Sequence, residues 1–486
     1  MTTPTLPPMS VADLAPLAPE LVLIGGAFAL MIADLFISNR NKVWTHLLSV
    51  LVLAVVLFML ATGTGGQGEV LNGMFVRDTA ADVMKAVIVL VTGMTLVYGF
   101  SYLRERNLFQ GEIPVLILFA TAGMMVLVSS GNLLMAYLGL ELLALSSYAL
   151  VASNRESGLS SEAAMKYFIL GSLASGLLLY GMSLVYGATG TLDLSDLNAA
   201  IATSDEGVLL MTGAVFMIAG VAFKLGAAPF HMWLPDVYQG APAPIAMFIS
   251  SAPKLAAFGM AYRLLEQGVG SLSDQLQLML AGLAALSLII GNLMALAQTN
   301  LKRMLAFSTV SHIGFLLMGI AGGGKDGYAA AMFYGITYAL MSTAAFGAII
   351  VLSRKGFEAE SIDDFKGLNA RNPWMAGMVL CIMASLAGVP PLLGFFSKMF
   401  VLSAAVNGGL LWLALLGVIA SVVGAFYYLR VIKVMYFDEP VGEPMPANDD
   451  RAVGILFGVN ALALLALALA FNPIMAWCQK AFAHLA

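Results

Sequence analysis

Fourteen apolar stretches, each about as long as a bilayer is thick, run through the sequence. A transmembrane helix needs about 20 consecutive, mostly apolar residues. Hydrophobic residues make up 60% of the chain and charged residues only 10%. A soluble domain has about 25% charged residues, which cover its water-facing surface. The sequence therefore predicts an all-α integral membrane protein. Its expected spans are residues 20–37, 45–63, 79–100, 113–129, 131–151, 164–187, 209–229, 244–264, 276–297, 303–321, 328–353, 373–404, 410–436 and 452–477.

The basic residues fall mostly on one side of these spans. With the N-terminus outside, fifteen of the 23 lysines and arginines lie in inside loops and four in outside loops. Inside loops carry an excess of Lys and Arg, so this bias predicts that both termini are outside. The N-terminal twenty residues lack a positively charged start, and we expect neither a cleaved signal nor a transit peptide. The inside set is Arg40, Lys42, Arg104, Arg106, Arg155, Lys166, Lys302, Arg303, Arg354, Lys355, Lys366, Arg371, Arg430, Lys433 and Arg451, and the outside set is Arg77, Arg263, Lys325 and Lys480.

Five charged side chains fall inside the predicted spans. They are Lys85, Glu141, Lys224, Lys254 and Lys398. A charge at the centre of a membrane helix costs roughly 2.5–3.5 kcal/mol on insertion scales, and such residues usually mark a path for ions or protons. Central charges of this kind are therefore candidate functional residues.

Two spans are interrupted by prolines, and each interruption lies near one of these lysines. Lys224 precedes the segment GAAPFHMW, and Lys398 follows GVPPLLG. Broken spans at corresponding places in two halves are the best sequence indication of a transport site. Lys224 and Lys398 are 174 residues apart, and Glu141 and His312 are 171 apart. We therefore predict that spans 4–8 recur, inverted, as spans 9–13.

This repeat predicts four regions. They are a three-helix segment (1–110), a first five-helix repeat (111–270), a second, inverted repeat (271–437) and a C-terminal helix (438–486).

Each central charge has a functional and a structural interpretation. Glu141 is either half of a structural ion pair or a proton-carrying carboxylate paired with Lys224, since apolar surroundings favour the neutral form of both groups. The breaks beside Lys224 and Lys398 either supply free carbonyls to an ammonium group or are packing kinks. Lys254 follows a proline about ten residues into its span, where it could reach water only with difficulty. For these residues we favour proton transfer.

The remaining candidates are less specific. His231 and His312 are either packing residues or proton relays, because imidazole gives and takes protons near neutral pH. Lys85 and Asp82 have the spacing of a helical pair near the outer end of a span, which predicts pairing or snorkelling.

Three charged residues on the inner side are candidates for proton uptake. Glu162 and Lys166 are either a surface pair or an uptake point, and Lys302 either sets topology or serves uptake.

Several other classes of protein are excluded. Cys381 and Cys478 lie far apart without metal-binding spacing, so this chain alone should hold no zinc or iron–sulfur site. No nucleotide-binding or nucleophile motif appears in its proper context, and no basic patch indicates nucleic acid. We expect no cofactor in this chain.

Two stretches resemble a known family. FKLGAAPFHMWLPDVYQGAPAP and NLKRMLAFSTVSHIGF are similar to signature segments of the antiporter-like membrane subunits of respiratory complex I. The similarity covers essentially the whole chain. Among the L, M and N types of that family, the chain resembles the N type. It stops at Ala486 without the lateral helix of the L type, and it has Lys398 where the M type has a glutamate.

The resemblance implies a non-redox, proton-translocating subunit of a bacterial NADH:quinone oxidoreductase in the inner membrane. Flavin, iron–sulfur clusters and quinone would bind to other subunits, and the M-type subunit and small membrane subunits would be partners within the lipid bilayer. It implies a charge pair of Glu141 with Lys224, a central Lys254 and an exit-side Lys398. The open alternatives are a subunit of a multi-component cation/proton antiporter and a purely structural membrane subunit.

Overall fold

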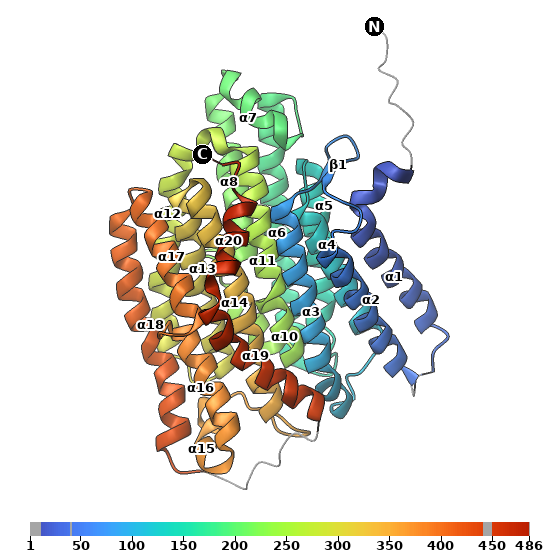
Figure 1. Ribbon diagram of the computed structural model, residues 1–486, viewed down its shortest axis with the longest axis vertical. Helices are drawn as coiled ribbons and strands as arrows, with labels where there is room; N and C mark the ends of the chain where they lie inside the picture. The colour runs from blue at the N-terminus through green and yellow to red at the C-terminus, as the bar shows by residue number, and fades with distance from the viewer. Residues whose placement is uncertain (1–10, 39–40, 441–449, 486) are drawn as a thin grey trace.

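The computed structural model describes residues 11–38, 41–440 and 450–485, and most of its helices run along the long axis of the molecule (Figure 1). By length and apolarity, twelve helices among these residues could cross a membrane. The predicted class, an all-α multi-span membrane protein, is confirmed. The predicted count of fourteen stays a prediction, because the fourth and twelfth expected spans correspond to shorter helices. Arg40 and residues 1–10 of the expected signal-free N-terminus lie outside the described residues.

The elements are as follows. The α-helices are α1 (Ala18–Asp34), α2 (Val43–Ala61), α3 (Thr79–Glu105), α4 (Glu112–Val128), α5 (Leu133–Val151), α6 (Gly158–Thr189), α7 (Leu194–Thr203), α8 (Gly207–Leu225), α9 (Trp233–Gly240), α10 (Ala243–Ser250), α11 (Ala252–Ala261), α12 (Ser273–Leu296), α13 (Leu301–Gly322), α14 (Gly324–Leu352), α15 (Leu368–Arg371), α16 (Pro373–Ala387), α17 (Leu393–Asn407), α18 (Leu411–Phe437), α19 (Arg451–Leu469) and α20 (Phe471–Ala481). Short helical segments are η1 (Val11–Leu17), the π-helix η3 (Tyr262–Gly268), η4 (Gly270–Leu272) and η5 (Ile362–Phe365). Strands β1 (Gly68–Val70) and β2 (Phe75–Arg77) form an antiparallel hairpin in which Gly68 pairs with Arg77.

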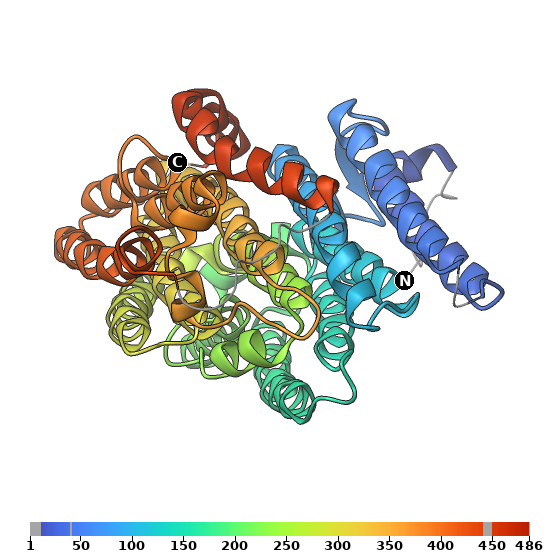
Figure 2. The ribbon, with the colours of Figure 1, turned by 90° about the horizontal axis from the view of Figure 1, so that it is seen from below.

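The two ends of the bundle carry different elements. α7 and the β1–β2 hairpin lie at the upper end in Figure 1, which we call the outer end, and α15 lies at the lower, inner end. η1 and the C-terminal part of α20 are both at the outer end. Seen from below, α1 and α2 form a pair at one edge, and α19 crosses obliquely beside the bundle (Figure 2). The two ends of the described chain are thus on one side, as predicted. Which side of the membrane that is remains a prediction.

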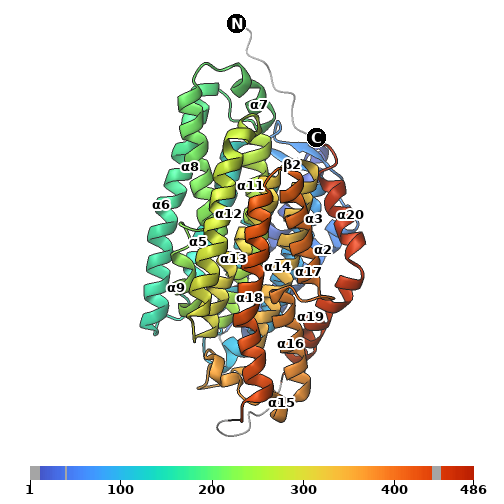
Figure 3. The ribbon, with the colours of Figure 1, turned by 90° about the vertical axis from the view of Figure 1, so that its left-hand side faces the viewer.

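Both predicted helix breaks are present. α8 ends at Leu225, where Gly226 has a φ of 88°, and the chain passes Pro229 before α9 begins. Figure 3 shows α8 and α9 as the upper and lower parts of this broken span. α16 ends in the same way, with Gly388 at a φ of 87° before Pro390. Positive φ costs glycine almost nothing, because it has no Cβ.

A third break was not predicted. The eighth expected span divides into α10 and α11 at Ser251, whose φ is −113° and ψ −94°. The π-helix η3 follows α11 at its outer end. The last expected span is also divided, into α19 and α20. Neither division is marked by the glycine–proline pattern that revealed the other two.

Two helix hairpins at opposite ends of the bundle share the same local construction. Asn132 caps the start of α5 and forms a β-bridge with Asp193, 61 residues later, beside the outer β-hairpin. Asn300 caps the start of α13 and bridges to Ser361, also 61 residues later, next to η5. A matched motif at opposite ends is what an inverted repeat would produce. The correspondence supports the predicted repeat, whereas its four regional boundaries stay predictions.

Glycines bring the helices of each hairpin into backbone contact. A Cβ added at Gly123 of α4 would lie 2.6 Å from the backbone nitrogen of Leu143 in α5. A Cβ at Gly291 of α12 would lie 2.5 Å from the nitrogen of Ser311 in α13. Without a hydrophobic driving force between helices in lipid, such close packing supplies much of the association energy.

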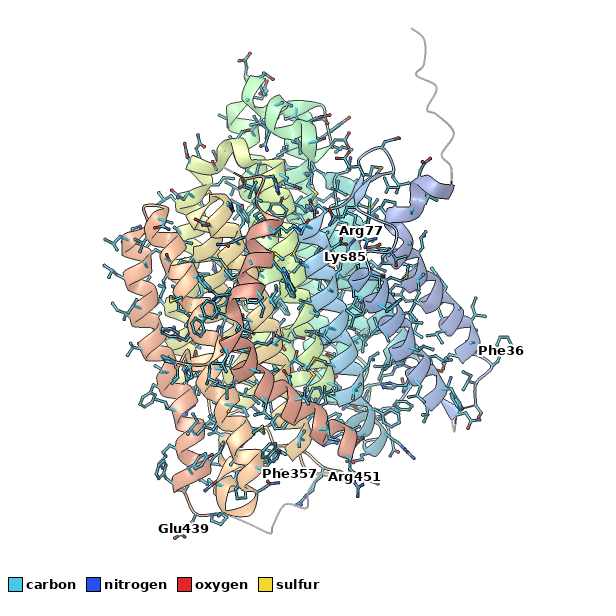
Figure 4. All side chains as sticks on the ribbon, in the orientation of Figure 1. Phe36, Arg77, Lys85, Phe357, Glu439 and Arg451 are labelled. Atoms are coloured by element: carbon cyan, nitrogen blue, oxygen red, sulfur yellow. The ribbon has the colours of Figure 1, made fainter. Side chains whose placement is uncertain are left out.

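The charges of the N-terminal helices pair differently from the prediction. Lys85 does not pair with Asp82. Its ammonium lies 2.6 Å from Glu20 of α1, and both residues are buried, with exposures of 0% and 2%. Asp82 instead binds Arg77 at 2.7 Å. Figure 4 labels Arg77 and Lys85 near the outer end of α3. The buried pair fastens α1 to α3, a contact between residues too distant in sequence for local spacing to reveal.

Two arginines assigned to outside loops are also buried. Arg77 is 1% exposed and Arg263 is 0% exposed. Arg263 pairs with Asp78 at 2.8 Å. Both cations therefore lie within the outer end of the bundle, where carboxylates and carbonyls compensate them, and not on its surface.

The close helix contact can be tested with one methyl group. We expect Gly123→Ala to lower the stability of the assembled protein by about 1–3 kcal/mol, because the methyl would overlap the α5 backbone. Gly176→Ala, in α6, is the control, since a Cβ there meets nothing within 4 Å. Alanine is favoured over glycine in a helix by about 1 kcal/mol, so this variant should be neutral or slightly stabilised. The stability of each variant is measured as the temperature at which half of the purified complex dissociates. Equal midpoints for the two variants would contradict close α4–α5 packing.

Candidate functional site

The break between α8 and α9 exposes backbone carbonyls that buried side chains satisfy. The Lys254 ammonium donates to the carbonyl of Leu225 at 2.8 Å and more weakly to that of Lys224 at 3.4 Å. The indole N–H of Trp233 donates to the Phe223 carbonyl at 3.0 Å. The last carbonyls of a helix have no partner within the helix and carry its negative dipole end. The break therefore forms a binding site for an ammonium group deep in the protein.

Lys254 is almost completely enclosed, with 1% of its surface exposed. Its ammonium also lies 4.7 Å from the ring centroid of Trp233, within range of a cation–π interaction. The unpredicted break at Ser251 starts α11 just before Lys254 and aims its side chain at the α8 terminus. Carbonyl oxygens and an aromatic face thus replace water around this charge.

Lys224 occupies the last turn of α8 and is 7% exposed. Glu141, in α5, contributes a favourable electrostatic interaction to Lys224, whereas Lys254 and Lys224 repel each other. Among the described residues, Glu141 and Lys224 do not form an ion pair within 4.0 Å. Glu141 is half-buried, and one of its oxygens has no hydrogen-bond partner. The predicted charges are therefore near each other, but they interact through space.

The second break binds the other central lysine. The Lys398 ammonium donates to the carbonyl of Ala387, the last residue of α16, at 2.8 Å and lies 5.2 Å from the ring centroid of Phe315. Lys398 is 7% exposed. At the first break, the lysine that binds the free carbonyl, Lys254, belongs to the following span. At the second break, the binding lysine, Lys398, belongs to the broken span itself. When the breaks are aligned, Lys398 therefore matches Asp236 and not Lys224, although the sequence spacing suggested that the lysines correspond.

His312 connects three helices near the second break. Its Nδ1 lies 2.6 Å from the hydroxyl of Tyr334 in α14, and its Nε2 lies 3.0 Å from that of Tyr428 in α18. Tyr428 is hydrogen-bonded in turn to Ser308. His312 is 3% exposed and experiences the charge of Lys398. An imidazole with hydroxyls on both nitrogens can accept a proton on one side and release it on the other.

A chain of buried hydroxyls leads from this histidine toward Lys254. The ring of Tyr338 packs against that of His312, tilted by 40° with 5.0 Å between ring centroids, and its hydroxyl donates to Thr309 at 2.7 Å. Tyr338 also interacts with Ser342, one turn further along α14, and Ser342 donates to Ser250 at 2.8 Å. Ser250 ends α10, four residues before Lys254. Polar groups thus lie at intervals through the core between Lys254 and Lys398.

The sequence did not single out these hydroxyls. Serine, threonine and tyrosine are common in membrane helices, and Ser250 and Ser342 belong to no motif, whereas Thr309 lies within the signature segment NLKRMLAFSTVSHIGF. The four-residue spacing of Tyr334, Tyr338 and Ser342, which places them on one face of α14, is the only local signal.

His231 does not belong to this series of hydrogen-bonded hydroxyls. It lies just after Pro229, half-buried, with its ring centroid 6.3 Å from that of Phe307. Its Nδ1 is buried without a hydrogen-bond partner. The structure therefore brings His312, but not His231, into contact with the central hydroxyls.

The candidate uptake residues form two groups at the inner end. Lys166 pairs with Glu162 at 2.7 Å and with Asp236 at 2.8 Å, and Arg303 also binds Asp236 at 2.8 Å. The Glu162 and Lys166 side chains are 62% and 44% exposed.

In the second inner group the lysine is buried. Lys302 is 2% exposed, pairs with Glu360 at 2.6 Å and donates to the carbonyl of Ala241 at 3.3 Å. Asp236 and Glu360 were not predicted, because their partners lie about 60 or more residues away in the chain.

Among the described residues, no group of three or more His, Cys, Asp or Glu side chains is arranged to hold a metal ion. Lysines, one imidazole and several hydroxyls are the polar groups that the candidate site offers.

Comparison with known proteins identifies relatives. Residues 130–424, more than half of the chain, match the family described as NADH:quinone oxidoreductase/Mrp antiporter, TM. The chain is 78% identical to NADH-quinone oxidoreductase subunit N of Xanthomonas euvesicatoria pv. vesicatoria (strain 85-10) over 486 residues, which is 100% of both chains.

Solved structures agree on the fold. A chain of respiratory complex I from Thermus thermophilus with bound aureothin is 30% identical, with a TM-score of 0.81 over 94% of this chain and 98% of that one. A chain of the Mrp complex from Dietzia sp. DQ12-45-1b has a TM-score of 0.85 over 98% of both chains. At 22% identity, this second likeness shows the fold alone. From its full-length identity to a named relative and its family match, the chain belongs to the NADH-quinone oxidoreductase subunit N family.

Proposed function

We propose that this chain is a proton-translocating membrane subunit of a bacterial NADH:quinone oxidoreductase. Its relatives' names connect it to that complex. The observation that carries the proposal is the buried polar chain between Lys254 and Lys398. Such a chain is costly to bury in a membrane, and intramembrane ionisable residues usually mark an ion or proton pathway.

The proposed route begins at Lys224 and Lys254. Two ammonium groups repel each other, so protonation of one lysine favours release of a proton from the other. The proton then passes along Ser250, Ser342 and Tyr338, each of which can donate and accept a hydrogen bond. His312 receives it and transfers it to Lys398. Water between the hydroxyls would complete the path where they are not in direct contact.

Glu141 would control the direction in which the proton moves. A carboxylate near Lys224 lowers the free energy of the protonated lysine, and two unit charges 4 Å apart attract by about 4 kcal/mol at an effective dielectric constant of 20. Quinone reduction elsewhere in the complex would move the carboxylate relative to Lys224. The protonated lysine then loses its stabilisation and passes its proton to the next group. The step changes electrostatic energy and forms no covalent bond.

The assembly follows from the same proposal. Flavin, iron–sulfur clusters and quinone would reside in other subunits, and the M-type subunit and small membrane subunits would flank this chain. Both termini would face the periplasm, which places the inner end at the cytoplasm. The exposed apolar side chains of α1, α2, α6 and α18 would face lipid or these partners.

Replacement of Lys224 tests the electrostatic control. We expect Lys224→Ala to leave the complex assembled while lowering NADH:quinone electron transfer and proton pumping by about tenfold or more, since a positioned proton-transfer group commonly contributes at least about 100-fold. Membrane vesicles carrying the whole complex allow both rates and the assembled amount to be measured. Normal pumping at normal assembly would remove Lys224 from the mechanism and favour a structural role.

Replacement of Tyr338 tests the hydroxyl chain. Tyr338→Phe removes the hydrogen bond to Thr309 and the interaction with Ser342 but keeps the ring, so proton pumping should fall several-fold with a stability loss of about 1–2 kcal/mol. Tyr98→Phe is the control, because Tyr98 is also fully buried but lies in α3, away from the hydroxyl chain. Equal pumping by the two variants would contradict transfer through Tyr338.

Pumping that requires Na⁺ would instead indicate a cation/proton antiporter.

A further inference from the structure

A water-accessible pocket at the inner end contains one buried lysine. The pocket has a volume of about 390 Å³, and its wall is formed by the end of α3, the α9–α10 junction, the start of α13 and residues 356–360. Figure 4 labels Phe357, part of this wall, at the lower end of the molecule. Lys302 and Glu360 form one ion pair in it, and Arg106 and Glu358 form another.

The two ion pairs differ in their ability to release a proton. Arg106 also donates to the carbonyls of Arg354 and Phe357, and the hydroxyl of Tyr102 donates to Glu358 at 2.8 Å. Arginine does not deprotonate in proteins, so this pair is a fixed support for the pocket wall. Lysine can lose its proton when it is buried. Lys302 is 2% exposed, whereas the Glu360 side chain is 27% exposed toward the pocket.

A buried tyrosine hydroxyl without a hydrogen-bond partner lies between Lys302 and the hydroxyl chain. Lys302 and Thr309 are seven residues apart in α13, which places them on one face about 10 Å apart along the axis. Tyr238, on α9 just before the pocket wall, is 0% exposed. Its hydroxyl interacts weakly with Thr309 and has no partner in full hydrogen-bond geometry. Leaving a buried hydroxyl unpaired costs about 1–3 kcal/mol, so such a group calls for a functional or solvent partner.

The other inner-end candidates do not share this arrangement. The Glu162–Lys166 pair is largely exposed, and Lys166 is held by Asp236, which Arg303 also binds. These side chains do not contribute to the pocket wall. Their arrangement fits a charged surface network on α6, α9 and α13.

We propose that Glu360 and Lys302 form the proton-uptake site of this subunit. The inference rests on the proposed function and adds the place where the proton leaves the cytoplasmic water. In the resting pair Lys302 is protonated and Glu360 is a carboxylate. Lys302 releases its proton inward, through Tyr238 and intervening water to Thr309. There the proton joins the hydroxyl chain and reaches Lys254, where the proposed route begins. Glu360 then accepts a proton from pocket water and passes it to Lys302, which restores the pair. One proton enters from the pocket for each proton that moves inward.

The first test removes the carboxylate. Inside-out membrane vesicles containing the whole complex expose the inner end to the medium, so NADH-driven proton uptake reports this step. We expect Glu360→Gln to lower uptake by about tenfold at unchanged assembly, and Glu360→Asp to retain most of it. Glu112→Gln is the control. Glu112 is a carboxylate of the same end, paired with Arg155 at 3.4 Å, and lies outside this pocket. Wild-type uptake by Glu360→Gln would overturn the proposal.

The second test separates proton transfer from a purely structural ion pair. Lys302→Arg keeps the positive charge and can keep the bond to Glu360, but its guanidinium cannot release a proton. We expect an assembled complex in which uptake falls by about tenfold. An ion pair that only fastens residues 356–360 to α13 would work equally well with arginine, so normal uptake by this variant would overturn the proposal.

If Glu360→Gln and Lys302→Arg pump normally while Tyr338→Phe and Lys224→Ala do not, the uptake site is elsewhere and the proposed function stands. If all four pump normally, both inferences fail.

Discussion

The structure depends on how buried ammonium groups are stabilised at interrupted helices. Lys254 binds the carbonyl of Leu225, and Lys398 binds that of Ala387. In each case a helix ends inside the protein, where unpaired backbone groups would cost several kcal/mol. The lysine satisfies carbonyls that the break leaves open, and the carbonyls and helix dipole compensate the lysine. Neither feature would be stable at this depth without the other.

Other elements follow from these two contacts. Each break needs a glycine at positive φ to end the helix, and prolines to prevent its continuation. Irregular backbone at membrane depth must be enclosed by protein, and α10, α11, α13 and α14 supply that enclosure as the most completely buried helices. Their polar side chains are consequently forced to bond to one another. The hydroxyl chain through Tyr338 is the result, since buried hydroxyls without partners would destabilise the core.

The sequence revealed the features that carry a local signature, and missed those defined by contacts between distant segments. Spans, the two glycine–proline breaks and the lysines beside them are visible because length, apolarity and proline act on the chain locally. Ser250 and Ser342 are ordinary polar residues until folding places them 2.8 Å apart. The pairs of Lys85 with Glu20 and of Lys302 with Glu360 depend on which helix faces each lysine, which spacing within one helix cannot determine. The break at Ser251 has no glycine to mark it.

The distribution of charge explains why a proton could cross such a core. Between Lys254 and Lys398 the connecting groups are hydroxyls and one imidazole, and the carboxylates lie outside this interval, at Glu141 and Glu360. A fixed carboxylate in the middle would bind the proton strongly and hold it, because charges interact strongly in a low-dielectric interior. Neutral hydroxyls stabilise a passing proton without retaining it. The lysines at each end supply repulsion that expels a second charge. Placing carboxylates at the margins and hydroxyls in the centre therefore favours movement over storage.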